Sequence, residues 1–72
     1  MAKTEISNVI RRLRFEHGEM TQQSLAERVG CTRQTILLLE QGRYVPSLAL
    51  ALKIARVFGR TVDEVFQLEE KR

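Results

Sequence analysis

The side chains that most often serve as nucleophiles, general bases or metal ligands are scarce in this sequence. His17 is the only histidine and Cys31 the only cysteine, and neither has a partner at the spacing of a catalytic triad or a shared metal site. No paired carboxylates and no glycine-rich phosphate loop can be recognised. We therefore expect no enzymatic activity, no metal and no cofactor, with His17 at the surface and Cys31 packed beside a helix.

A different chemistry is available on one short helix, predicted from residue 33 to 41 in the stretch TRQTILLLEQG. At 100° per residue, Ile36 and Leu39 lie on the inward side of this helix. The opposite side then carries Gln34, Leu37, Leu38 and Gln41. Two leucines are thus predicted to be exposed near Arg33 in the first turn, in a chain with few apolar residues to spare. We expect this face to contact a partner.

Glycine and proline divide the chain into five segments, each with helical character. The dividing residues are Gly18, Gly30, Gly42, Pro46 and Gly59. Apolar residues at helical spacing predict an amphipathic first helix over about residues 5–17. Only the stretch VFQLE near the end alternates with the period of a strand, and no hairpin turn is apparent. The predicted fold class is therefore all-α, with five helices in a single domain, residues 1–72.

The four later segments each begin with a residue that can accept a hydrogen bond from a free backbone N–H at a helix start. These expected N-cap residues are Thr21, Thr32, Ser47 and Thr61. Glu64 follows the last of them by three residues, which is the spacing of a capping box. The fourth helix is apolar on most of its sides, so it is predicted either to lie at the centre or to be covered by a second subunit.

Composition limits the possible environments and partners. The net charge is +3, and residues 1–60 hold ten Lys or Arg against five Asp or Glu. A basic body is compatible with a polyanionic partner, although many soluble proteins are equally basic. No apolar stretch is long enough for a signal peptide or a membrane span, and a single cysteine fits a reducing compartment. We expect a cytoplasmic protein without a membrane segment, too short for an added ligand-binding or protease domain.

The combination of these motifs resembles the helix-turn-helix of the phage-repressor, or Cro/XRE-type, transcriptional regulators. The resemblance runs from about residue 6 to 66 and rests on TQQSLA, Ala26, Gly30, TRQTI, LEQG and PSLALALKIA. It implies a compact five-helix, lambda-repressor-like DNA-binding domain with its helix-turn-helix at residues 21–42. In that arrangement the helix at 33–41 enters the major groove of double-stranded DNA, and the helix at 22–29 crosses the backbone.

The resemblance also implies roles for individual residues. Phosphate contacts fall to Gln22, Thr32, Arg43 and Tyr44. Arg33 and Gln34 occupy the two positions that read base edges, where arginine pairs best with guanine and glutamine with adenine. Gln41 shares their outward face. Arg14 and Glu40 match a buried salt bridge between the first and third helices, which is a structural role.

Two interpretations of Leu37 and Leu38 remain open. Either leucine could pack on the methyl group of thymine, or the pair could pack on a protein partner. Smaller or polar residues are common at these positions in the family.

The expected function is sequence-specific DNA binding by a transcriptional repressor. One short recognition helix makes few base contacts, so we expect a homodimer on an inverted-repeat operator, with half-site centres about 34 Å apart. The dimer interface is predicted in the segment 61–72, through Val62, Val65, Phe66 and Leu68. No small-molecule ligand is expected. The alternative is a protein interaction module of the same fold, either a DNA-binding antitoxin or an adaptor.

Overall fold

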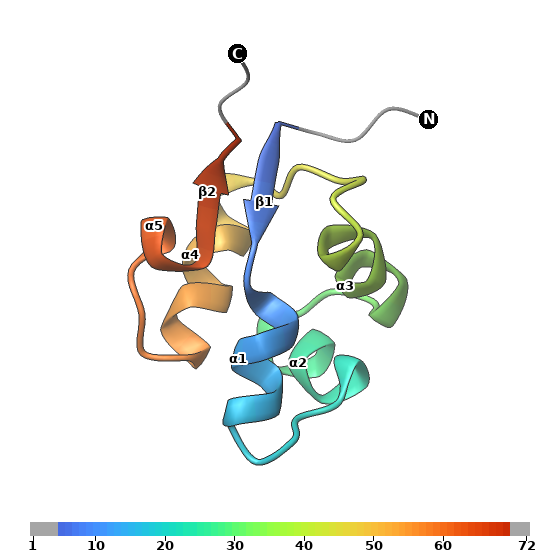
Figure 1. Ribbon diagram of the computed structural model, residues 1–72. Helices are drawn as coiled ribbons and strands as arrows, with labels where there is room; N and C mark the ends of the chain where they lie inside the picture. Colours follow the sequence, from blue (N-terminus) through green and yellow to red (C-terminus); the bar gives the residue numbers. More distant parts are fainter. Residues whose placement is uncertain (1–4, 70–72) are drawn as a thin grey trace.

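The computed structural model describes residues 5–69 as five short helices and one small sheet (Figure 1). In chain order the elements are β1 (Ile6–Asn8), α1 (Ile10–Glu16), α2 (Gln22–Val29), α3 (Arg33–Glu40), α4 (Leu48–Val57), α5 (Val62–Val65) and β2 (Phe66–Leu68). Residues 1–4 and 70–72, which include the end of the predicted dimerisation segment, lie outside the described part.

The expected helix starts are present at the expected residues. Thr21, Thr32 and Ser47 each accept a hydrogen bond through the side-chain oxygen from the backbone N–H three residues on. At the fifth start, the Glu64 carboxylate accepts from the Thr61 backbone N–H at 2.9 Å. Local side-chain chemistry therefore fixes where α2, α3, α4 and α5 begin.

The all-α prediction is wrong at the two ends of the described chain. Residues 6–8 were expected in the first helix, but they form β1 and pair antiparallel with β2. The register places Ile6 opposite Leu68 and Asn8 opposite Phe66, and the Glu69 N–H donates to the Glu5 carbonyl at 2.7 Å. The apolar spacing of residues 6–13 fits a helix, but a strand far along the chain offers these residues a partner that no local pattern reveals.

The hydrophobic core lies where the five helices meet. Its largest fully buried side chains come from every helix: Ile10, Leu13, Leu25, Ile36, Leu39, Ile54 and Val65. α4 contributes Ile54 and the buried Ala51 and Ala55 to this core. One side of α4 is therefore central, which agrees with one of the two alternatives predicted for the fourth helix. Val65 has no exposed surface, which is a correction to its expected place in a dimer contact. Its role is to anchor α5.

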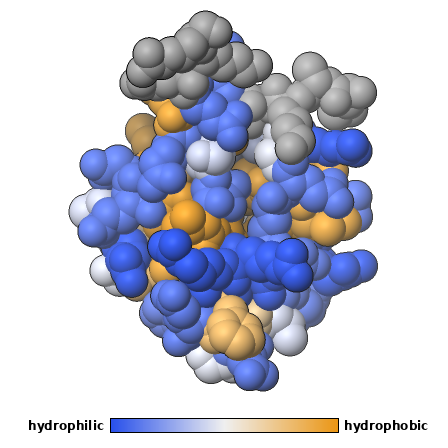
Figure 2. All heavy atoms as spheres, in the orientation of Figure 1, coloured by the Kyte–Doolittle hydropathy of each residue, from blue (hydrophilic) through white to orange (hydrophobic). Residues whose placement is uncertain are grey.

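Hydrophobic surface remains outside the core in several places. Side chains of α4, the preceding loop and β2 are exposed, namely Val45, Leu48, Leu52 and Leu68. Figure 2 shows hydrophobic side chains on the left, in the region of α4, α5 and β2, a further group on the right in the region of α3, and a separate group low in the view near α1. The exposed large apolar side chain of α1 is Phe15, at 68% exposure. No helix within residues 5–69 is long and apolar enough to cross a membrane.

Candidate nucleic-acid interface

α2 and α3 form a helix-turn-helix whose turn is fixed by residues 30–32. Gly30 ends α2 in the left-handed region, with φ of +76°, and the Cys31 N–H donates to the Ala26 carbonyl at 3.0 Å. Thr32 then begins α3. Ala26 is fully buried, which fits a small side chain where two helices approach closely. Because glycine adopts positive φ without steric cost, the chain can reverse here in three residues.

One side of α3 is buried, and the other presents polar groups. Ile36 and Leu39 lie in the core, whereas Arg33, Gln34 and Gln41 are exposed at the two ends of the helix. The three polar side chains are therefore available to a ligand, as the sequence predicted.

Leu37 and Leu38 are half-buried, so the prediction that they are exposed is wrong. A helical wheel gives the direction of each side chain around the helix axis, but it does not predict how much of that side chain the rest of the fold covers. The Arg43 N–H donates to the Leu38 carbonyl at 2.9 Å, so the chain turns directly after the last turn of α3. Part of each leucine remains accessible, so a contact to a thymine methyl remains a hypothesis.

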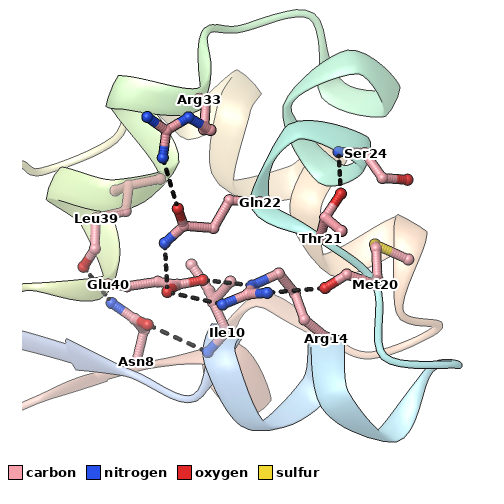
Figure 3. A network of polar contacts seen from close by, with 10 residues as sticks. All are labelled: Asn8, Ile10, Arg14, Met20, Thr21, Gln22, Ser24, Arg33, Leu39 and Glu40. Carbon is pink, nitrogen blue, oxygen red and sulfur yellow. Dashed lines mark hydrogen bonds and ion pairs between the residues drawn. The ribbon is translucent and has the colours of Figure 1, made fainter.

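A network of polar contacts holds the last turn of α3 against α1 (Figure 3). Arg14 donates to both carboxylate oxygens of Glu40, from Nε at 2.6 Å and from Nη2 at 3.1 Å. The third nitrogen, Nη1, donates to the Met20 carbonyl at 2.8 Å. Only 14% of the Arg14 side chain and 9% of the Glu40 side chain are exposed. The ion pair expected between the first and third helices is thus bidentate and mostly buried.

Gln22 extends this network to the first turn of α3. Its Nε2 donates to Glu40 Oε1 at 3.1 Å, and its Oε1 faces Arg33, whose Nη1 donates at 3.4 Å. Since Glu40 can only accept hydrogen bonds when ionised, it orients the amide of Gln22 with the oxygen towards Arg33. Gln22, which the family resemblance assigned to a phosphate contact, therefore also contacts α3 at both ends.

The remaining expected phosphate ligands lie at the surface next to α3. Thr32 is exposed at the N-terminus of the helix, and Arg43 and Tyr44 are exposed in the loop that follows it. The Thr32 hydroxyl already accepts from the Thr35 N–H at 3.2 Å. Together with the exposed end residues of α3, these groups place donors for an anionic ligand at both ends of the helix, at residues 32–34 and 41–44.

The structure also identifies a residue that the sequence analysis did not single out. Asn8 donates from Nδ2 to the Leu39 carbonyl at 2.7 Å and accepts at Oδ1 from the Ile10 N–H at 3.1 Å. An asparagine just before a helix is a common capping signal. That signal was concealed because residues 5–9 were assigned to the helix interior.

The residues expected in a dimer interface lie away from α3. Val62 and Phe66 are half-buried against the core and Leu68 is 76% exposed, on elements that Figure 1 places across the molecule from α3.

His17 is exposed, as expected, and its ring contacts that of Phe58 edge-on. Cys31 packs against the core, and burial raises the pKa of its thiol, which favours the unreactive protonated form. No group of three potential metal ligands occurs among residues 5–69.

Comparisons with known proteins agree with this geometry. The sequence model of the helix-turn-helix family matches residues 10–65. An uncharacterised HTH-type transcriptional regulator of Methanothermobacter thermautotrophicus is 57% identical over 63 residues, which are 86% of this chain and 90% of the relative. The HTH-type regulator YgzD of Bacillus subtilis is 47% identical over 66 residues, covering 92% of this chain and 98% of the relative.

A solved structure shows the same fold. The P22 c2 repressor, crystallised with a synthetic operator, superimposes with a TM-score of 0.65 at 20% identity, over 75% of this chain and 85% of that one. At this identity the match concerns the fold, whereas the family match and the two relatives concern the sequence itself. The chain belongs to the helix-turn-helix family of DNA-binding transcriptional regulators, of the Cro/XRE type.

Proposed function

We propose that the protein is a repressor that binds an inverted-repeat operator as a homodimer and reads base edges with the first turn of α3. The observation that carries the proposal is the contact of Arg33 with Gln22, which is itself held by the buried Glu40. A base-reading arginine whose orientation is restrained before binding loses less conformational freedom in the complex, so its bidentate contact to the base contributes more to affinity.

The contacts divide into two classes by position and chemistry. Arg33 and Gln34 are exposed at the helix end and can each form two hydrogen bonds to one base in the major groove. Gln22, Thr32, Arg43 and Tyr44 flank them and are assigned to the phosphate backbone, with Gln41 at the far end of α3. Backbone contacts fix the register of the protein on DNA, whereas the base contacts supply the preference.

Dimerisation is proposed through the hydrophobic surface that α4, α5 and β2 leave exposed, which we call the apolar face. It comprises the exposed Val45, Leu48, Leu52 and Leu68 and the half-buried Ile6, Val62 and Phe66. Ile6, Val45, Pro46, Leu48, Ala51, Val62 and Phe66 line a groove of about 260 Å³. Leu48 and Leu68 are more than 70% exposed. A monomer of this size has little reason to expose so many large apolar side chains, and a second copy would cover them.

This apolar face differs from the interface expected from the sequence. Val65 is excluded because it is buried, and residues of α4 and the loop before it are added. The proposal satisfies both sequence alternatives for α4, because one side of it is central and the other is open to a second subunit.

The test is selection of bound duplexes from a random DNA library, at two salt concentrations, with the wild type and Arg33→Ala. Enrichment of an inverted repeat by the wild type, together with a weaker sequence preference in Arg33→Ala, would support a homodimer that reads base edges. A protein adaptor of the same fold predicts no enrichment even at low salt, and an unchanged sequence preference in Arg33→Ala would refute the role of Arg33.

A further inference from the structure

Asn8 connects three elements, one through its backbone and two through its side chain. Its backbone pairs with Phe66 in the sheet, its Oδ1 accepts from the first N–H of α1, and its Nδ2 donates to the Leu39 carbonyl in the last turn of α3. Figure 3 shows the amide lying between Ile10 and Leu39, beside the ion pair of Arg14 and Glu40. No other hydrogen bond between side chain and backbone in residues 5–69 spans so much sequence, since this one joins residues 31 positions apart.

The position demands an amide. One end of the side chain must accept a hydrogen bond and the other must donate, which asparagine does and aspartate or leucine of similar size does not. The Leu39 carbonyl accepts a second hydrogen bond from the Gly42 N–H at 3.0 Å. Asn8 therefore acts where the chain leaves α3 for the loop that carries Arg43 and Tyr44.

Asn8 and Arg14 hold α3 in different ways. Arg14 grips the carboxylate of Glu40, which is separated from the backbone by rotatable bonds, whereas Asn8 bonds directly to the backbone. An eight-residue helix is about 12 Å long, so a shift of 1 Å at its last turn corresponds to a tilt of roughly 5°. Bidentate contacts to a base are sensitive to such a tilt because two hydrogen bonds must be aligned at once.

We propose that Asn8 is a positioning residue for base recognition, which fixes the direction of α3 and of the loop after it relative to β1 and α1. The inference rests on the proposed function. Asn8 connects the sheet to α3, the proposed recognition helix. Strand β1, which was expected to be helical, therefore helps to position α3 directly.

Two substitutions separate the bond to α3 from the bond to α1. In Asn8→Asp the carboxylate still accepts from the Ile10 N–H, but it cannot donate and it repels the Leu39 carbonyl. In Asn8→Ser the shorter side chain keeps a hydroxyl oxygen that can accept from the Ile10 N–H, but it does not reach the Leu39 carbonyl. This variant tests the same bond if the aspartate variant folds poorly. Ile54→Val is the control, because it removes one methylene from the core, at a residue with no exposed surface and no place in the proposed interface.

The experiment measures dissociation constants for the selected operator and for a duplex of unrelated sequence, at a temperature where circular dichroism shows every variant to be folded. The ratio of the two constants reports discrimination. We expect it to fall roughly tenfold per half-site in both Asn8 variants, with little change in the affinity for unrelated DNA. The control should keep the wild-type ratio.

The outcomes distinguish the two proposals. An unchanged ratio in both Asn8 variants, or an equal loss in Ile54→Val, would overturn the positioning role and leave the proposed function standing. A wild-type protein without any sequence preference would overturn the proposed function, and this inference with it.

Discussion

At the scale of single residues, the buried ion pair organises the interface without being part of it. Glu40 accepts three hydrogen bonds, two from Arg14 and one from Gln22, so its charge is satisfied although its side chain is almost inaccessible. Arg14 in turn supplies a donor to the Met20 carbonyl in the loop before α2. The pair therefore joins three segments, namely α1, the last turn of α3 and the loop before α2, whose alignment the proposed reading of bases by α3 requires.

Removing one partner of this pair is expected to cost more than replacing both. Glu40→Ala leaves the Arg14 guanidinium mostly buried and unpaired, and we expect a loss of about 3 kcal/mol in the free energy of unfolding. The double variant Arg14→Met with Glu40→Leu should lose less, since no charge is left in the interior. Denaturant unfolding of both variants would decide, and a double variant less stable than the single one would contradict this view of the pair.

At the scale of elements, the sequence predicted what local chemistry determines. The threonines and the serine that begin α2, α3, α4 and α5 are strong signals, and Gly30 marks the turn, so the starts of these four helices could be placed from the sequence. The sheet could not be predicted, because residues 6–8 and 66–68 are separated by most of the chain and β1 carries a spacing compatible with a helix. The half-burial of Leu37 and Leu38 was missed for a related reason, since a helical wheel ignores neighbouring loops.

Gly30 is the element-scale position with the clearest backbone requirement. Its φ of +76° is unfavourable for a residue with a Cβ, although a Cβ there would meet no other atom within 4 Å. Gly30→Ala is therefore expected to lower the free energy of unfolding by about 1 kcal/mol through backbone strain alone. Gly30→Asn should lose less, because asparagine tolerates the left-handed region. Thermal unfolding of the two variants tests this order, and equal losses would mean that strain at Gly30 is not the cause.

At the scale of the whole molecule, the two proposed functions of the surface fall mainly on different elements. The proposed DNA-reading side lies on α3 and the ends next to it, whereas the apolar face lies on α4, α5 and β2 (Figures 1 and 2). The terminal sheet brings the two ends of the described chain together beside the apolar face. A second copy bound there would give the pair of recognition helices that an inverted repeat requires.

Leu68→Glu is expected to convert a dimer into a monomer. The side chain is 76% exposed, so the substitution leaves the core intact but places a charge in the proposed interface. Sedimentation analysis should show the loss of the dimer, and operator binding should weaken by a factor of ten or more, on the order of 1.4 kcal/mol. Phe15→Glu is the matched control, since Phe15 is 68% exposed but lies on α1, outside the apolar face. If the control dissociates the protein equally, or Leu68→Glu remains dimeric, the apolar face is not the interface.

The most direct test of base reading by α3 is a thermodynamic cycle between Arg33 and the guanine it is expected to contact. Dissociation constants are measured for the wild type and Arg33→Ala, on the selected operator and on one with that guanine–cytosine pair replaced. We expect a coupling of about 1–3 kcal/mol for Arg33, and none for Arg43→Ala, which should weaken binding to both duplexes alike. A coupling near zero for Arg33 would contradict the assignment of α3 as the reader of sequence.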